Sequence, residues 1–200
     1  MKYHKFFIAI FILLTIIIVD IFYNAKNYID ISDMAVPIET VMSNTGWQVI
    51  PPRYDEFCQY RIFHLRCDNF FWENNQNKET LIISVKKMLT PLEASLEFPL
   101  EVKAYTSTAI DMPNFNVNRS ALYPKNWTFS HYLLDDQIVI CAYGNEFACG
   151  NWWYLGRIGQ YTFLVILSAG HKQIYDKNSF EIVIESVVDY WSALLVEDIR

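Results

Sequence analysis

The sequence predicts an α+β fold, in which an N-terminal single transmembrane helix precedes one domain with an antiparallel β-meander and a C-terminal helix. An apolar stretch opens the chain, β-type segments occupy about residues 137–168, and helically spaced apolar residues follow at about 179–196. A meander followed by a helix is typical of α+β domains with antiparallel sheets. Hydrophobic types make up 52% of the 200 residues and charged types 19%, which excludes a disordered chain.

Residues 1–25 are interpreted as a cytoplasmic start and a transmembrane signal anchor. The apolar stretch runs from Phe6 to Val19 and resumes after Asp20 as far as Tyr23, a total of 18 residues. At about 1.5 Å of rise per residue, this helix is roughly 27 Å long, close to the thickness of a hydrocarbon core. It is apolar on every side, unlike the single stripe of a helix buried in a soluble fold. The predicted partner of residues 6–23 is therefore the lipid bilayer.

A cleaved signal peptide is the alternative to an anchor. Cleavage requires small residues at the first and third positions before the cut. A cut after Ala25 would place Tyr23 at the third position, and a cut after Ala35 would place Asp33 there. Neither residue is small, so we expect an uncleaved anchor, with a secreted domain as the alternative.

The charges around the apolar stretch predict its orientation. Lys2 and Lys5 precede it, and the positive-inside rule keeps such an end in the cytoplasm. Residues 26–45 would then form a juxtamembrane stalk, and residues 46–200 an extracytoplasmic domain. The net charge of −6 argues against nucleic acid as a partner, because phosphate recognition needs basic surface.

Four cysteines follow the apolar stretch: Cys58, Cys67, Cys141 and Cys149. An even number in an exported domain favours disulfides, although four cysteines allow three pairings. Local pairing is the simplest prediction, and the Cys141–Cys149 bridge is the better supported because turn-forming residues separate two β-type segments. The spacings match neither zinc nor redox motifs, so we expect no metal and no cofactor.

The elements between the stalk and the meander are predicted from short patterns. They are strands at 47–50, 80–89 and 128–134, a hairpin or irregular strand within 58–72, a polar turn at 73–78, and one or two helical turns within 90–124, where Pro91, Pro99 and Pro113 interrupt the chain.

The meander predicts a register and two faces. If Cys141 faces Cys149, then Ile138 faces Trp152, and a two-residue loop at Ile158-Gly159 makes Trp152 face Val165. Alternation along the strands then assigns side chains to two faces: Ile138, Ile140, Trp152, Tyr154, Phe163, Val165 and Leu167 on one, and Val139, the two cysteines, Asn151, Trp153, Leu155, Leu164 and Ile166 on the other. Because both faces are largely apolar, both need cover.

The C-terminal segment is predicted to form a helix that supplies cover. Asn178 and Glu181 fit a capping box at its start. A strand at 180–188 is the alternative, because many residues there are β-branched. The apolar positions with helical spacing are Phe180, Val183, Ile184, Val187, Trp191, Leu194 and Leu195.

Chemical motifs are scarce. The sequence contains no G-x-S-x-G, no phosphate-binding Gly-rich loop and no H-E-x-x-H pattern. Asp135 and Asp136 are interpreted as a solvated turn, and His131 near Asp135 lacks a nucleophile motif. Asn118 and Asn126 have the form of glycosylation acceptors. We assign no catalytic residue.

Two functions remain open. The main hypothesis is a membrane-anchored extracytoplasmic binding or assembly module without catalytic activity, with a protein partner in the membrane or envelope. Trp153 is the candidate interface residue, whereas Trp152 is expected in the core. The alternative is a membrane-tethered extracytoplasmic hydrolase with a dispersed active site, drawing on groups such as His64, His131 and Asp135. Convergent polar groups with perturbed pKa values in a pocket would favour the hydrolase, and an exposed apolar patch would favour binding.

Overall fold

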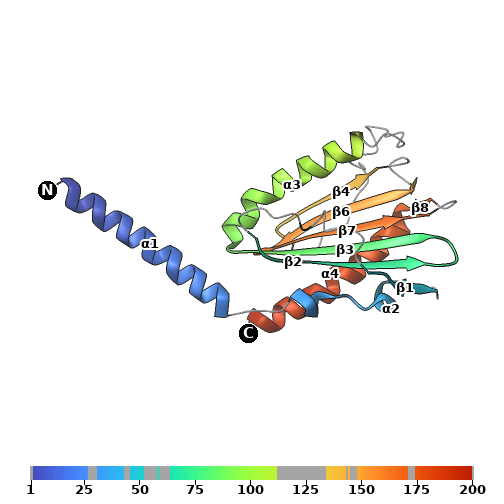
Figure 1. The fold of residues 1–200 in the computed structure, drawn as a ribbon, viewed down its shortest axis with the longest axis horizontal. Helices are drawn as coiled ribbons and strands as arrows, with labels where there is room; N and C mark the ends of the chain where they lie inside the picture. Colours follow the sequence, from blue (N-terminus) through green and yellow to red (C-terminus); the bar gives the residue numbers. More distant parts are fainter. Residues whose placement is uncertain are drawn as a thin grey trace.

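The computed structural model describes residues 2–26, 31–42, 46–51, 58, 64–111, 134–142, 144, 148–170 and 174–199. It confirms the α+β class, with an antiparallel sheet of six strands and a long C-terminal helix (Figure 1). The elements in chain order are α1 (Lys2–Lys26), the 3-10 helix η1 (Ile31–Met34), α2 (Ile38–Val41), β1 (Trp47–Val49), β2 (His64–Asn74), β3 (Glu79–Met88), α3 (Pro91–Asp111), β4 (Asp136–Cys141), β5 (Ala148–Cys149), β6 (Asn151–Ile158), β7 (Tyr161–Ser168), β8 (Tyr175–Asp176) and α4 (Lys177–Ile199).

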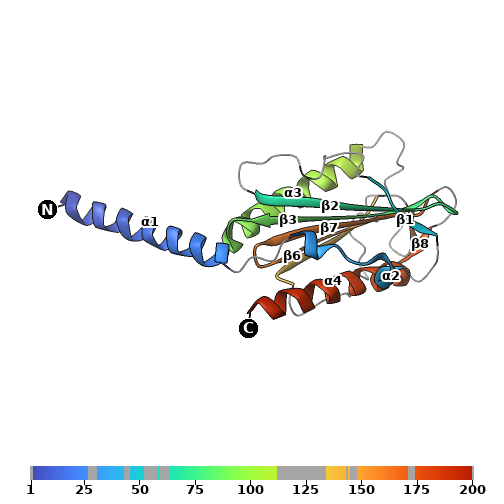
Figure 2. The same ribbon diagram turned by 60° about the horizontal axis from the view of Figure 1, so that its bottom comes forward.

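The six-stranded sheet has the order β1-β2-β3-β7-β6-β4. The first three strands form one antiparallel meander and the last three another, and β3 pairs with β7 to join them. α4 covers one face of the sheet and α3 the other (Figure 2). This arrangement confirms that both faces of the meander are covered. The strand predicted at 128–134 lies outside the described residues.

The predicted faces of the β6–β7 hairpin are correct, although its register is shifted. The turn is formed by Gly159 and Gln160, and Trp152 pairs with Leu167 instead of Val165. Gly159 has a φ of 55°, which suits glycine at the start of such a turn. Because the partner changes by two residues, every side chain stays on its predicted face.

The predicted register between β4 and β6 is wrong. Cys141 pairs with Trp152, not with Cys149, and Ile138 pairs with Leu155. The partner shift of three residues is odd, so the two faces of β4 are exchanged relative to the prediction. The cause is that Cys149 lies in β5, which pairs with β8, so β4 and β6 are not joined by a tight hairpin.

α4 confirms the predicted C-terminal helix and its buried stripe. Phe180, Ile184, Val187 and Trp191 are all fully buried against the sheet. The predicted cap is wrong, because the capping side chain is that of Asp176. Its carboxylate accepts hydrogen bonds from the Ser179 backbone N–H (2.9 Å) and hydroxyl (2.8 Å). These bonds, led by the backbone one, hold the pKa of Asp176 below its usual value.

α3 is much longer than the one or two helical turns predicted within 90–124, because Pro91 and Pro99 do not interrupt it. Pro91 occupies the first helical position, where its missing N–H costs nothing. The Glu93 N–H donates to Thr90 Oγ1 (3.1 Å), and Glu93 Oε2 accepts from the Leu89 N–H (3.0 Å). This reciprocal cap starts a 21-residue helix, within which Pro99 lies on the exposed side.

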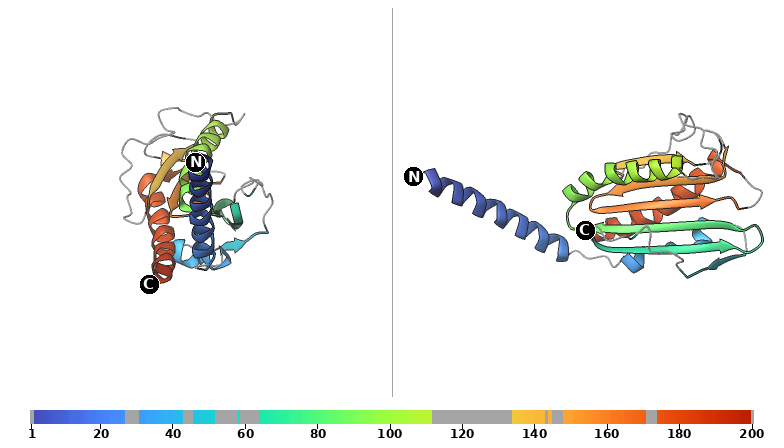
Figure 3. Two further views of the ribbon diagram at one scale, coloured as in Figure 1. Left: turned by 90° about the vertical axis from the view of Figure 1, so that its left-hand side faces the viewer. Right: turned by 45° about the horizontal axis from the view of Figure 1, so that its top comes forward.

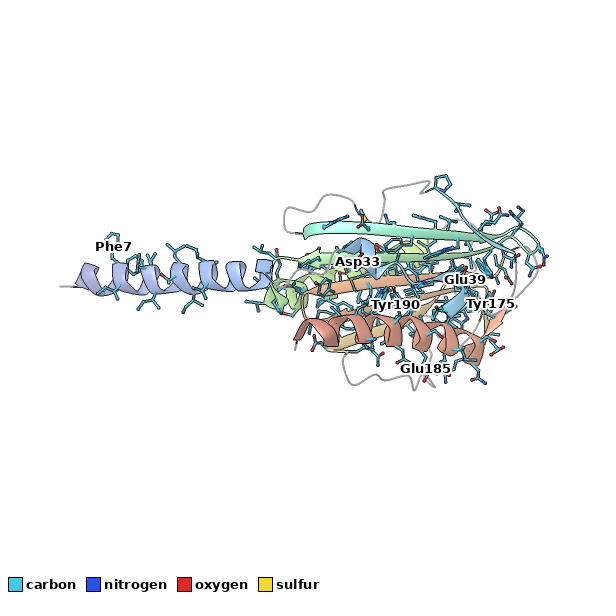
Figure 4. The ribbon with its side chains drawn as sticks, turned by 90° about the horizontal axis from the view of Figure 1, so that it is seen from below. Phe7, Asp33, Glu39, Tyr175, Glu185 and Tyr190 are labelled. Atoms are coloured by element: carbon cyan, nitrogen blue, oxygen red, sulfur yellow. A yellow bond between two sulfur atoms is a disulfide. The ribbon has the colours of Figure 1, made fainter. Side chains whose placement is uncertain are left out.

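The segment 31–42 contributes apolar side chains to the core of the domain. Ile31 and Met34 are at most 1% exposed, and the Trp191 indole N–H donates to the Met34 carbonyl (2.8 Å). The Tyr190 hydroxyl donates to the Asp33 carbonyl (3.4 Å), and both residues are labelled in Figure 4. Residues 31–42, which lie within the predicted stalk 26–45, therefore pack against the sheet and α4.

α1 projects from the domain as a separate helix (Figure 1). Its described apolar side chains are exposed, from 38% at Ile10 to 71% at Phe11. Among the described residues, no helix has both the length and the apolarity to cross a membrane. The membrane span thus stays a prediction from the sequence.

Candidate functional site

Two disulfides are present, and both have the predicted local connectivity. Cys58 is bonded to Cys67, with their Cα atoms 5.5 Å apart, and Cys141 is bonded to Cys149, with a Cα separation of 5.8 Å. The second bridge ties the end of β4 to β5 within the core. Disulfides persist in oxidising compartments, so this pair fits an extracytoplasmic domain.

The two neighbouring tryptophans are both buried, on opposite faces of the sheet. Trp152 is fully buried, stacks on Phe180 (5.3 Å between ring centroids) and donates its indole N–H to the Tyr175 carbonyl (3.0 Å). Trp153 is 3% exposed and meets Tyr105 of α3 edge to face at 5.9 Å. The core position predicted for Trp152 is confirmed. The burial of Trp153 contradicts its interpretation as an exposed interface residue.

The acidic pair before β4 has a structural partner. Arg157 Nε contacts Asp136 Oδ2 (2.8 Å), and Arg157 Nη1 contacts Asp135 Oδ2 (3.1 Å). Asp135 also accepts a hydrogen bond from the Gly159 N–H (2.7 Å). These contacts fasten the start of β4 to the β6–β7 turn.

The side chains of the two histidines that were candidates for catalysis lie outside the part of the chain that the structure describes. His64 lies in β2, but its side chain is outside the described set. His131 and the two asparagine sequons at 118 and 126 lie outside the described residues.

Two tyrosines have perturbed acidity, and both serve as structural hydrogen-bond donors. Burial raises the pKa of Tyr175, and a hydrogen bond to the buried Glu79 and the negative charge of its carboxylate raise it further. Burial also raises the pKa of Tyr154, whose hydroxyl contacts Gln137 Oε1 (2.7 Å). Both phenols remain protonated at neutral pH. The first pair links β8 to β3, and the second links β6 to β4.

An ion pair connects α3 to the sheet. Lys86 Nζ lies 2.5 Å from Glu101 Oε1, and their side chains are 13% and 7% exposed. Such a pair fixes where the helix rests on the strands, since a displaced α3 would leave a charge buried without its partner. In the part of the chain that the structure describes, no group of His, Cys, Asp or Glu side chains could hold a metal ion.

The outer face of α3 is the candidate interaction surface. Leu92, Leu96 and Leu100 are 69%, 67% and 54% exposed, and exposed Pro99 lies among them. We call these four residues the leucine stripe. The leucines are spaced at i, i+4 and i+8, so they lie along one side of the helix. This surface is absent from the sequence prediction, although the Thr90-Pro91-Leu92-Glu93 start and the leucine spacing are signals of a helix with one leucine-bearing side.

Comparison with protein-family models, with curated proteins and with solved structures finds no match. A functional proposal for this chain therefore depends on its own surfaces and charges.

Proposed function

We propose that the protein is a membrane-anchored extracytoplasmic binding or assembly module, held at the bilayer by α1. The observation that carries the proposal is the exposed apolar surface of this helix. Phe7 is 68% exposed and Phe11 71%, and Figure 4 shows Phe7 pointing away from the α1 axis. An apolar surface of this extent in water is unfavourable and marks a site of contact.

The only polar residue between Phe6 and Val19 is compatible with a lipid environment. The Thr15 hydroxyl donates to the Phe11 carbonyl within the same helix (2.8 Å). Polar groups in hydrocarbon must be satisfied internally, and this bond satisfies the hydroxyl donor. The basic residues Lys2 and Lys5 before the stretch support a cytoplasmic N-terminus.

The disulfides and the leucine stripe support the two remaining parts of the proposal. A domain tied by two disulfides suits the outer side of the membrane. The leucine stripe presents aliphatic side chains to the surroundings, as contact surfaces do. The perturbed groups among the described residues each have a structural partner, which favours binding over hydrolysis.

The test compares matched lysine substitutions in the full chain. Ile12→Lys with Ile16→Lys places two charges in the middle of α1, where each costs about 3 kcal/mol in a membrane helix. Ile182→Lys on α4 is the control, because Ile182 is 61% exposed and apolar but lies outside α1. Membranes are washed with alkaline carbonate, and the chain is followed by immunoblot.

We expect the wild type and Ile182→Lys to stay in the membrane pellet and the α1 variant to move to the supernatant. Retention of the α1 variant in the pellet, or release of the wild type, would contradict anchoring by α1.

A further inference from the structure

The outer side of α3 is apolar near its start, which is unusual for a helix that covers a sheet. Such helices normally bury aliphatic side chains and expose their carboxylates. Here Leu96 is 67% exposed, whereas Glu101 is 6% exposed and contacts Lys86 of β3. Glu93 is also engaged, as the cap of the helix. The helix therefore buries Ala94, Phe98 and the paired Glu101 on its sheet side and leaves the leucines outside.

The stripe carries no charge. From Pro91 to Leu100, every exposed position of α3 is a proline or a leucine, and the first exposed charge along the helix is Lys103. An apolar partner that needs no complementary charge fits this surface. The leucines extend from residue 92 to residue 100, about 12 Å along the helix axis, which is short for a stable interface between two protein copies. A lipid surface imposes no such minimum area.

α1 and α3 are placed to meet the same surface. α3 begins at the end of the domain from which α1 projects (Figures 1 and 2). In both views of Figure 3, the N-terminal end of α1 lies toward the side of the domain that carries α3. A bilayer that holds α1 would thus face the outer side of α3.

We infer that the leucine stripe rests in the interfacial layer of the bilayer that holds α1, as a second, peripheral membrane contact. This inference rests on the proposed function and names the lipid surface as the partner of the α3 face. Apolar faces of interfacial helices lie about 5–10 Å into the boundary between headgroups and acyl chains. Because the stripe has no basic residue, contact with zwitterionic lipid is sufficient, and anionic lipid should not strengthen it.

The experiment places an environment-sensitive fluorophore at single positions of the full chain in phosphatidylcholine vesicles. The four native cysteines are all in disulfides, so an introduced cysteine is the single labelling site. Leu96→Cys reports on the stripe and Phe11→Cys on the anchor. Ile182→Cys is the matched control, since Ile182 is also an exposed aliphatic residue but lies on α4. Quenching is measured with a lipid that carries a nitroxide near the top of its acyl chain.

We expect strong quenching and a blue-shifted emission at position 96, and a water-like emission without quenching at position 182. The signal at position 96 should be the same when anionic lipid is added. Quenching at position 11 without quenching at position 96 would overturn the inference and leave the anchor intact. Absence of quenching at position 11 would instead overturn the proposed function. A dimer linked through Leu96→Cys before labelling would show that a second copy covers the stripe, and would also refute the inference.

Discussion

Replacing Trp152 by alanine should remove the main contact between the sheet and the start of α4. The indole is fully buried, stacks on Phe180 at 5.3 Å and donates to the Tyr175 carbonyl at 3.0 Å. Truncation of a large core aromatic side chain costs about 3–5 kcal/mol, and the lost hydrogen bond adds about 1 kcal/mol. The sum is a large fraction of the roughly 5–15 kcal/mol that stabilises a typical domain.

The assay is thermal unfolding of the oxidised full chain in detergent, followed by far-UV circular dichroism. We expect the midpoint of Trp152→Ala to fall by roughly 10–20 °C. Trp152→Phe keeps an aromatic ring against Phe180 and loses the N–H donor, so its cost should be about 1–2 kcal/mol. An unchanged melting curve for Trp152→Ala would refute the assignment of this face of β6 to the α4 side.

Three further predictions concern the ends and the inner contact of the covering helices. Lys86→Met should lower the free energy of unfolding in chemical denaturation by about 3 kcal/mol, because it leaves Glu101 buried without its cation. The double variant Lys86→Met/Glu101→Leu should regain most of this stability. Equal stabilities of the single and double variants would be inconsistent with this role. Thr90→Ala should cost about 1 kcal/mol by removing the cap of α3, and an unchanged unfolding midpoint would rule out that role. The Asp176 carboxyl has a lowered pKa, so its contribution to stability is present above its pKa in the unfolded chain and is lost as the pH falls through its pKa in the folded chain. An NMR titration should place the midpoint of Asp176 below 3.8. A midpoint at or above that value would disprove the cap.

The sequence predicted the fold class and the two faces of β6 and β7 because alternation and helical spacing are local properties. The faces of β4 could not be obtained in the same way. They depended on the assumption that Cys141 and Cys149 face each other on paired strands, whereas the disulfide joins β4 to the separate strand β5. A disulfide limits the distance between two residues without fixing strand register. One odd shift was then enough to exchange the faces.

The leucine stripe could not have been predicted as a surface from spacing alone. The leucines at 92, 96 and 100 show that they share one side of a helix, but not whether that side faces the sheet. The opposite side carries Ala94 and Phe98, which are the buried ones. Because apolar residues lie on both sides, the sequence does not indicate which side of this helix is buried, and Pro99 argues against a continuous helix. The contacts of Glu93 and Glu101 decide the orientation, and they exist only in the folded domain.

The most direct test of the account is whether the native chain keeps residues 6–23 and remains with the membrane. The protein would be purified from its own membranes after an alkaline wash, and its N-terminus would be sequenced. The account predicts a membrane-bound chain that retains this apolar stretch. A chain that begins near Ala25 or Lys26 and is recovered in the supernatant would contradict the account, because the domain would then be released without its anchor.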